Sequence, residues 1–210
     1  MFIEAFQRLE IPFDQLTHII ITHQDLDHIG GLPAMLKQHP HSIEVIANAI
    51  EKPYIEGDNM LLKITPESIE QAKAMLSESI PAAWRDAFIS TLEHPPKAPV
   101  NTIMNDREEL PLGGGLIVIE SPGHTPGHTS LYHKASKTLI AGDAMRVVEG
   151  QLAGPSPDQT LDMTLAMQSI QKFTHYDIET VICYHGGAYK DNHIHSSIAA
   201  LVEQYTIDKP

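Results

Sequence analysis

The segment HIIITHQDLDHIGG, residues 18–31, decides how the rest of this chain is interpreted. The β-branched run of residues 19–21 predicts a buried strand that ends at polar side chains. Four of these carry an imidazole or a carboxylate, namely His23, Asp25, Asp27 and His28. Beside an apolar strand such groups repel one another and are costly to desolvate, and a divalent cation removes both problems. The segment therefore indicates a metal site, with a polar loop after a strand as the plainer alternative.

Three later segments complete a pattern with the first one. They read SPGHTPGH at 121–128, AGD at 141–143 and YHGG at 184–187. With these four segments in this order, the chain resembles the metallo-β-lactamase superfamily over about residues 16–190. The first metal motif of that family is His-x-His-x-Asp-His after a strand, and this chain departs from it by having Asp25 in place of the second His.

The resemblance implies the fold. We expect a protein of the α/β (α+β) class, an αββα four-layer metallo-β-lactamase sandwich, in one domain of residues 1–210. The nearest branch is that of the lactonases and glyoxalase II-like enzymes. The length of 210 residues suits one domain whose core is stable without disulfides.

The resemblance also implies a dinuclear metal site. Carried over position by position, the metal ligands are His23, Asp25, Asp27, His28, His124, Asp143 and His185. The first ion falls to residues 23, 25 and 124 and the second to residues 27, 28 and 185, with Asp143 bridging. Each ligand follows a predicted strand, so a rigid sheet can hold the ligand loops in place.

Two such ions lower the pKa of a bound water and polarise the oxygen that it attacks. We therefore predict a metallo-hydrolase that cleaves a lactone, a thioester or a similar ester with a metal-bound hydroxide. Asp27 is the predicted catalytic residue, because a carboxylate bound through one oxygen keeps the other for the water or a proton. His128, four residues after His124, is predicted to orient a ligand, and packing under the loop is the equal alternative.

Two departures from the family pattern affect the chemistry. Zinc is the expected metal, but the oxygen donor of Asp25 shifts the preference toward iron or manganese. The flavodiiron oxidoreductases of the superfamily also have an acid at this position, although theirs is Glu. Arg146 stands where lactonases tend to have a Tyr, and we predict that it binds an anionic group of the substrate.

Residues 53–99 differ in composition from the rest and predict a helical cap. Two helices are expected there, over residues 65–77 and 81–92, with Thr65 as the N-cap of the first. Trp84 and Phe88 are predicted to line an apolar substrate pocket, with packing of the helix pair as the alternative.

The remaining elements follow from periodicity and breakers. We expect helices over 4–9, 31–39, 158–172 and 191–205, a loop at 12–14, and strands over 16–21, 43–47, 100–104, 115–120, 129–133, 137–140 and 180–184. Relatives that resemble this chain usually begin with several further strands, and these N-terminal strands are missing here. Both a start codon assigned too far downstream and a fragment would explain this.

Composition limits the partners. The 14 Lys and Arg against 27 Asp and Glu give a net charge of −13, which opposes binding to nucleic acid. No run approaches the roughly 20 apolar residues of a membrane span. The one cysteine, Cys183, allows no intramolecular disulfide, so we predict a cytoplasmic protein with a small-molecule substrate. The oligomeric state stays open, with a homodimer as one option.

Two other functions remain open. The first is a redox enzyme of the same fold with one or two iron ions, similar to the persulfide dioxygenases. The second is a truncated, non-catalytic fragment that binds metal.

Overall fold

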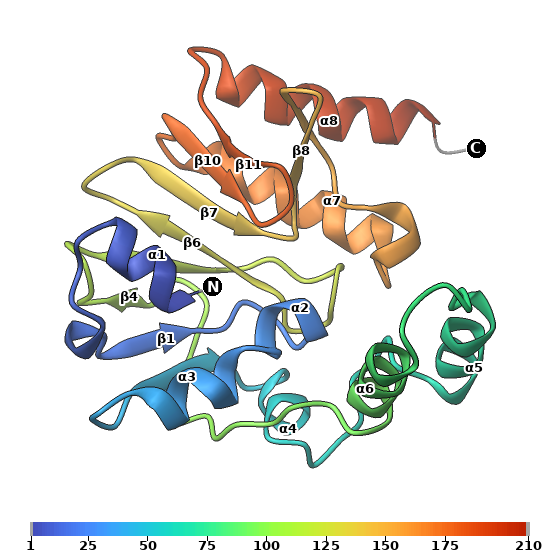
Figure 1. Ribbon diagram of the computed structural model, residues 1–210. Helices are drawn as coiled ribbons and strands as arrows, with labels where there is room; N and C mark the ends of the chain where they lie inside the picture. Colours follow the sequence, from blue (N-terminus) through green and yellow to red (C-terminus); the bar gives the residue numbers. More distant parts are fainter. Residues whose placement is uncertain (1, 209–210) are drawn as a thin grey trace. The chain divides into compact units, whose positions relative to one another are not determined.

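The computed structural model describes residues 2–208, and the chain divides into two compact units, Met1–Ile103 and Met104–Pro210 (Figure 1). Both units are mixed α/β: residues 2–208 contain a three-stranded sheet, a six-stranded sheet and a two-stranded hairpin. The prediction of a single domain over 1–210 stays a prediction.

The first unit is built around the three-stranded sheet β1-β2-β3. Its elements in chain order are α1 (Phe2–Arg8), the 3-10 helix η1 (Phe13–Gln15), β1 (His18–Ile20), α2 (Leu26–Ile29), α3 (Leu32–Gln38), β2 (Glu44–Asn48), α4 (Lys52–Ile55), α5 (Pro66–Met75), α6 (Ala82–Glu93) and β3 (Thr102–Met104). Strands β1 and β2 pair in parallel, with Ile19 opposite Val45. A parallel pair needs a crossover, and α2 and α3 supply it. The crossover thus carries the segment with the metal motif.

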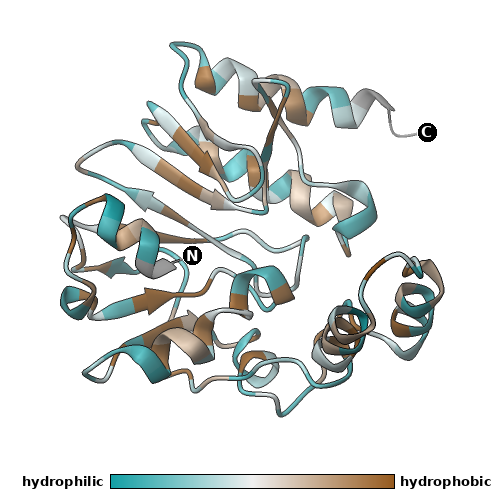
Figure 2. Ribbon diagram, viewed as in Figure 1, coloured by the Kyte–Doolittle hydropathy of each residue, from teal (hydrophilic) through white to brown (hydrophobic). Residues whose placement is uncertain are grey.

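The core of the first unit lies between this sheet and its helices. Val45 and Ala47 of β2 are fully buried with Ile29 of α2, Leu32 of α3 and Ile55 of α4. Figure 2 shows the apolar part of β1 as a brown segment of the ribbon. Because the end of β1 is fixed by this packing, the residues that follow it are held at the sheet edge.

The two helices expected over 65–77 and 81–92 are present as α5 and α6. In α5 the side chain of Thr65 accepts from the Ser68 N–H, and the Ser68 hydroxyl accepts from the Thr65 N–H, which is a capping box. Helix α6 has no fully buried residue among its twelve. Helix α4, which precedes the pair, was not predicted.

The second unit is built around the six-stranded sheet β11-β10-β7-β6-β5-β4. Its elements are β4 (Glu109–Leu110), β5 (Leu116–Glu120), β6 (Thr129–His133), β7 (Thr138–Gly142), β8 (Arg146–Val148), β9 (Gln151–Ala153), η2 (Pro157–Gln159), α7 (Met163–Lys172), η3 (Phe173–His175), β10 (Thr180–Cys183), β11 (Gly187–Tyr189) and α8 (Ile194–Asp208). Strands β7 and β10 pair in parallel and the others antiparallel. The parallel pair places the ends of β7 and β10 at one edge of the sheet.

Helices α7 and α8 pack together against this sheet. Ile170 of α7 and Ile198 of α8 are fully buried in one cluster with Leu139 of β7, Val181 of β10 and Phe173 of η3. The residues on the inner side of α7 recur at helical spacing, so the helix buries one stripe and exposes the other.

Some element boundaries differ from the prediction. The helix expected over 158–172 begins at Met163, because the Asp162 side chain caps it by accepting from the Leu165 N–H at 2.9 Å. The strand expected over 16–21 is shorter, and the loop expected at 12–14 overlaps η1. The prediction missed α2, α4, β4, β8, β9 and β11, which have two to four residues each. Elements this short carry too few residues for a period to be recognised.

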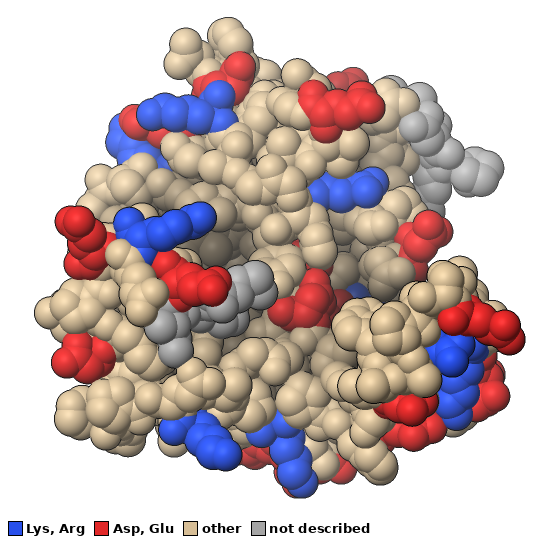
Figure 3. Space-filling view, in the orientation of Figure 1, with Lys and Arg blue, Asp and Glu red and all other residues tan. Residues whose placement is uncertain are grey.

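The surface and the helices bear on two further predictions. On the face shown in Figure 3, Lys and Arg side chains lie in separate small groups among acidic ones. That the chain does not bind nucleic acid stays a prediction. Within residues 2–208, the helices are all too short or too polar to cross a bilayer.

Candidate metal centre

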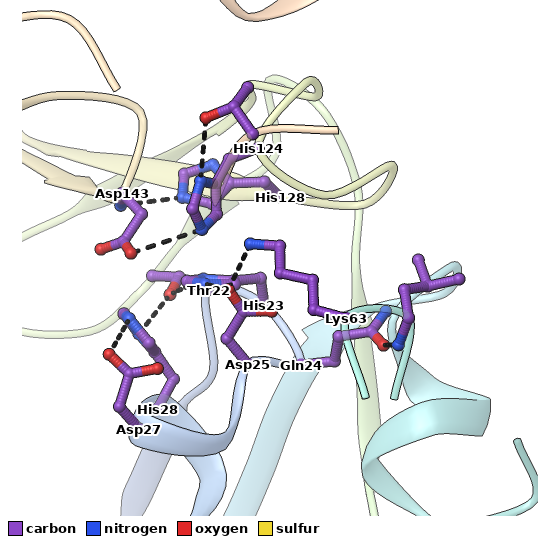
Figure 4. Close-up of polar contacts among 12 residues, drawn as sticks. Thr22, His23, Gln24, Asp25, Asp27, His28, Lys63, His124, His128 and Asp143 are labelled. Atoms are coloured by element: carbon purple, nitrogen blue, oxygen red, sulfur yellow. Dashed lines mark hydrogen bonds and ion pairs between the residues drawn. The ribbon is translucent and has the colours of Figure 1, made fainter. Parts of the chain in front are cut away.

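The first unit contributes one group of potential metal ligands, on the segment between β1 and α2. His23 and Asp25 precede the helix, and Asp27 and His28 lie in its first turn. The Nε2 atom of His23 is 3.2 Å from Oδ2 of Asp25 (Figure 4). The Nε2 atom of His28 is 3.7 Å from Oδ2 of Asp27. Each imidazole therefore faces a carboxylate of the same segment.

Thr22 orients both imidazoles of this group. Its hydroxyl oxygen lies 3.1 Å from Nδ1 of His23 and 3.3 Å from Nδ1 of His28 (Figure 4). When Nδ1 carries the proton and donates it to this oxygen, the lone pair of Nε2 is directed toward the carboxylate. One hydroxyl thus lies beside the Nδ1 atoms of both histidines.

The second unit contributes the other group, from three loops that follow strands. His124 follows β5, Asp143 follows β7 directly, and His185 follows β10. The Nε2 atoms of His124 and His185 each lie 3.4 Å from the same atom, Oδ2 of Asp143. Nδ1 of His124 is 3.4 Å from the Thr160 hydroxyl. One carboxylate oxygen thus faces two imidazoles, and the bridging role predicted for Asp143 stays a prediction.

His128 belongs to the same unit and is fully buried. Its Nε2 accepts from the Asp143 N–H at 3.0 Å (Figure 4). Its Nδ1 therefore carries the proton and donates to Ser121 Oγ at 2.9 Å. The Ser121 hydroxyl lies 2.8 Å from Ser130 Oγ, which donates to the Ala141 carbonyl at 3.0 Å. This buried chain of hydrogen bonds begins and ends on the backbone around β7.

Gly123 fixes the approach of the His124 loop to α7. A side chain there is excluded, since a Cβ atom would lie 2.3 Å from the Ala166 backbone nitrogen and φ is +135°. The Gly123 carbonyl also accepts from the N–H of Asp162, the N-cap residue of α7, at 2.9 Å. The loop and the helix terminus are therefore joined by the main chain.

The residues predicted to contact the substrate belong to β8 and α6. Arg146 is in β8, and its Nε donates to the Gly154 carbonyl at 3.1 Å, at the end of the hairpin away from its turn. Trp84 and Phe88 stack on each other along α6, with ring centroids 5.8 Å apart, and the Trp84 residue is 59% exposed. Their roles toward a substrate stay predictions.

Three polar residues around the first group were not singled out from the sequence. Lys63 pairs with Asp25, and Gln24 pairs with Glu51, which is fully buried. No local signal identifies Lys63 or Glu51, because each lies more than twenty residues from the motif that it contacts.

The donors suit a divalent cation. Imidazole nitrogen and carboxylate oxygen bind zinc, iron and manganese. In each unit the histidines turn Nε2 toward a carboxylate, and three of them place Nδ1 beside a threonine hydroxyl. This arrangement leaves the metal-binding atoms directed at one another, as in histidine sites with an outer hydrogen-bond partner.

The sequence profile of the metallo-beta-lactamase superfamily matches residues 3–185 of this chain. The chain belongs to this superfamily. The metallo-β-lactamase fold and the class of metallo-hydrolase, both predicted from sequence, are thereby confirmed.

Other members of the superfamily give the scale of the similarity. The chain is 31% identical over 194 residues to the probable metallo-hydrolase YflN of Bacillus subtilis, covering 87% of this chain and 69% of that protein. It is 29% identical over 140 residues to the hydroxyacylglutathione hydrolase GloC of Haemophilus influenzae, covering 66% and 54%. The crystal structure of the metallo-beta-lactamase family protein TTHA1429 from Thermus thermophilus superposes with a TM-score of 0.66 at 21% identity, covering 97% of this chain and 65% of that one.

Proposed function

We propose that this chain is a hydrolase of an ester-like bond, in a lactone, a thioester or a similar acyl compound, with two divalent cations as cofactors. One observation carries the proposal: in both ligand groups the histidine Nε2 atoms face carboxylate oxygens at 3.2–3.7 Å. The order of the four motifs in the sequence supports the assignment of both groups as metal ligands.

When bound, a pair of divalent cations supplies Lewis acidity and makes water a stronger nucleophile at neutral pH. The residues of the chain have separate tasks. Asp27 lies in the first turn of α2 and is exposed, so its carboxylate can hold a water molecule and accept a proton. Asp143 is held at its backbone by His128, which leaves its carboxylate to the imidazoles of His124 and His185.

The acyl substrate class has support from a relative. The name of GloC specifies hydrolysis of a hydroxyacylglutathione, and this relative matches 66% of the chain. The lactone and thioester classes share a carbonyl carbon that a water attacks, so one set of residues can serve both.

The test is a substrate panel with metal control. Protein dialysed against a chelator is reconstituted with zinc, manganese or iron(II) and assayed with lactones, acyl thioesters and simple esters. We expect hydrolysis of at least one class above the rate of the metal salt alone, lost on chelation and restored by metal. A reconstituted protein that contains metal but hydrolyses no member of the panel would contradict the proposal.

An iron redox enzyme is the second candidate, and Asp25 favours it. A carboxylate in place of an imidazole hardens the donor set and suits iron better than zinc. Oxygen consumption by the iron(II)-loaded protein with a persulfide substrate would favour this candidate over the hydrolase.

A further inference from the structure

An ammonium group occupies the position beside Asp25. Nζ of Lys63 lies 2.5 Å from Oδ2 of Asp25 (Figure 4), and the two side chains are only 17% and 14% exposed. The same Oδ2 atom faces Nε2 of His23 at 3.2 Å. The carboxylate that replaces the family's second histidine is therefore shared between an imidazole and a cation from a segment 38 residues away.

The residue before Lys63 is held by the metal-motif segment itself. The N–H of Leu62 donates to Oε1 of Gln24 at 2.8 Å. The backbone N–H and the side-chain amide of Gln24 both donate to Oε2 of Glu51, at 2.9 and 3.0 Å. Gln24 and Glu51 are fully buried. This network fixes the distance between the motif and the main chain that carries Lys63.

Lys63 is also held from its other side. The Ser68 hydroxyl donates to the Lys63 carbonyl at 3.2 Å, and Ser68 is part of the capping box with Thr65. The Ile64 N–H donates to the Leu61 carbonyl at 3.0 Å, which closes a turn around Lys63. With the main chain bonded on both sides, the Lys63 side chain starts from a fixed point and reaches Asp25 at little cost in entropy.

A largely buried ammonium next to a metal-binding carboxylate acts against a cation in two ways. It neutralises the negative charge of the Asp25 carboxylate, which would otherwise attract the cation, and it repels the cation itself. Both effects are stronger for side chains that are largely withdrawn from water than for exposed ones. They act on the ion assigned to His23 and Asp25, whereas the carboxylate of Asp27 faces the imidazole of His28.

We propose that Lys63 is an internal cation that competes with the divalent ion assigned to His23 and Asp25 and weakens its binding. The inference rests on the proposed function for the assignment of ligands to two ions. The chain then keeps the ion assigned to Asp27 and His28 tightly. The ion assigned to His23 and Asp25 is bound weakly. Lys63 therefore determines how many ions the chain holds at a given free metal concentration.

The experiment measures zinc binding to the full chain without any substrate. Parent protein and Lys63→Met are dialysed to equilibrium against a series of buffered free zinc concentrations, and bound zinc is determined by elemental analysis. We expect the parent to plateau near one ion per chain over a range in which Lys63→Met reaches two. The affinity for the second ion should differ by about 10- to 100-fold, the effect typical of a group next to a ligand.

Matched variants separate charge from packing. Lys63→Arg keeps the charge and should bind like the parent, and Lys63→Gln should bind like Lys63→Met. Lys73→Met removes a lysine of the same cap that pairs with Glu70 and Glu93 instead of a ligand, and it should change nothing. Circular dichroism verifies that each variant is folded. If Lys63→Met does not fold, Lys63→Gln takes its place in the comparison.

The outcomes separate the two proposals. Equal binding of two ions by the parent and by both neutral variants would overturn the inference while leaving the hydrolase intact. One ion in the parent and two in the neutral variants, with no substrate hydrolysed by either, would support the inference and overturn the hydrolase. Absence of zinc from every protein would overturn both.

Discussion

Nε2 of His128 accepts a hydrogen bond of 3.0 Å from the backbone N–H of Asp143. His124, four residues earlier, instead faces the side chain of Asp143. The two histidines of one motif thus contact the same aspartate at its two ends, and only His124 places a ring nitrogen beside the carboxylate. The sequence alone left His128 between an orienting role and simple packing, and its bond to the backbone of a predicted ligand makes the orienting role the one to test.

Replacing His128 should therefore weaken metal binding and the fold together. His128→Leu leaves the buried Asp143 N–H and Ser121 hydroxyl without the imidazole, which costs about 1–3 kcal/mol of the free energy of unfolding. Zinc affinity should fall by about 10- to 100-fold. His128→Gln, whose amide oxygen can accept from the Asp143 N–H, should lose less of both. Urea unfolding measures the free energy of unfolding, and competition with a chelator measures the zinc affinity. Equal losses of both in His128→Leu and His128→Gln would contradict the orienting role of His128.

Asp27→Asn should remove most of the hydrolytic turnover and keep the fold. Asn preserves the shape and one oxygen donor but loses the charge and the ability to accept a proton. At saturating metal we expect kcat to fall by about 10² to 10⁴-fold. Asp58→Asn, a change to an exposed acid outside the ligand set, is the control. Turnover within about threefold of the parent in fully metallated Asp27→Asn would show that this carboxylate is not catalytic.

Asp25→His should raise zinc occupancy relative to iron and manganese. The exchange replaces a hard oxygen donor with an imidazole that suits zinc. The change should be larger in the double variant with Lys63→Met, since the single variant leaves the Lys63 ammonium beside the new imidazole. Elemental analysis after loading from one metal mixture makes the comparison, and unchanged metal ratios in both variants would rule out position 25 as a ligand.

Gly123→Ala should destabilise the protein by about 2–4 kcal/mol. The new Cβ atom would meet the Ala166 backbone at 2.3 Å, and φ is +135°. Gly150→Ala is the matched control, because φ there is +76° but no atom lies within 4 Å of the added Cβ. It should cost only about 1 kcal/mol, the strain of the backbone alone. Similar losses in the two variants, measured by urea unfolding, would mean that the contact with α7 is not tight.

The Cys183 thiol should be inert in the folded protein. Burial raises its pKa to about 12, and the charge of Asp143 acts in the same direction. At pH 8 the thiolate population is then on the order of 10³-fold below that of an ordinary cysteine. Reaction with a disulfide reagent should be slow in buffer and fast in urea.

The same shift affects stability at alkaline pH. Because the pKa of this thiol in the folded protein lies above its ordinary value of 9.0, the unfolded state loses its proton first. The contribution of this thiol to stability is complete below pH 9 and is lost as pH rises from about 9 toward 12. Cys183→Ala should lack this component of the alkaline decline. An unchanged decline in that variant would assign it to other groups.

The sequence by itself determined the family, the class of fold and the candidate ligands. Those conclusions rest on local patterns, namely a β-branched run that ends at His23, glycines beside ligands, and helix starts such as Thr65. Each pattern is contained in a few consecutive residues, so it can be recognised without knowing what lies across the sheet.

The tertiary structure decided which partners those residues have. Lys63 reaches Asp25 from 38 residues away, Glu51 holds Gln24 from 27 residues away, and His128 binds the backbone of Asp143 from 15. No period or spacing encodes such contacts, because they arise where packed sheets and helices bring distant segments together. The charge balance around Asp25 depends on one of them, and so the sequence motif alone did not reveal it.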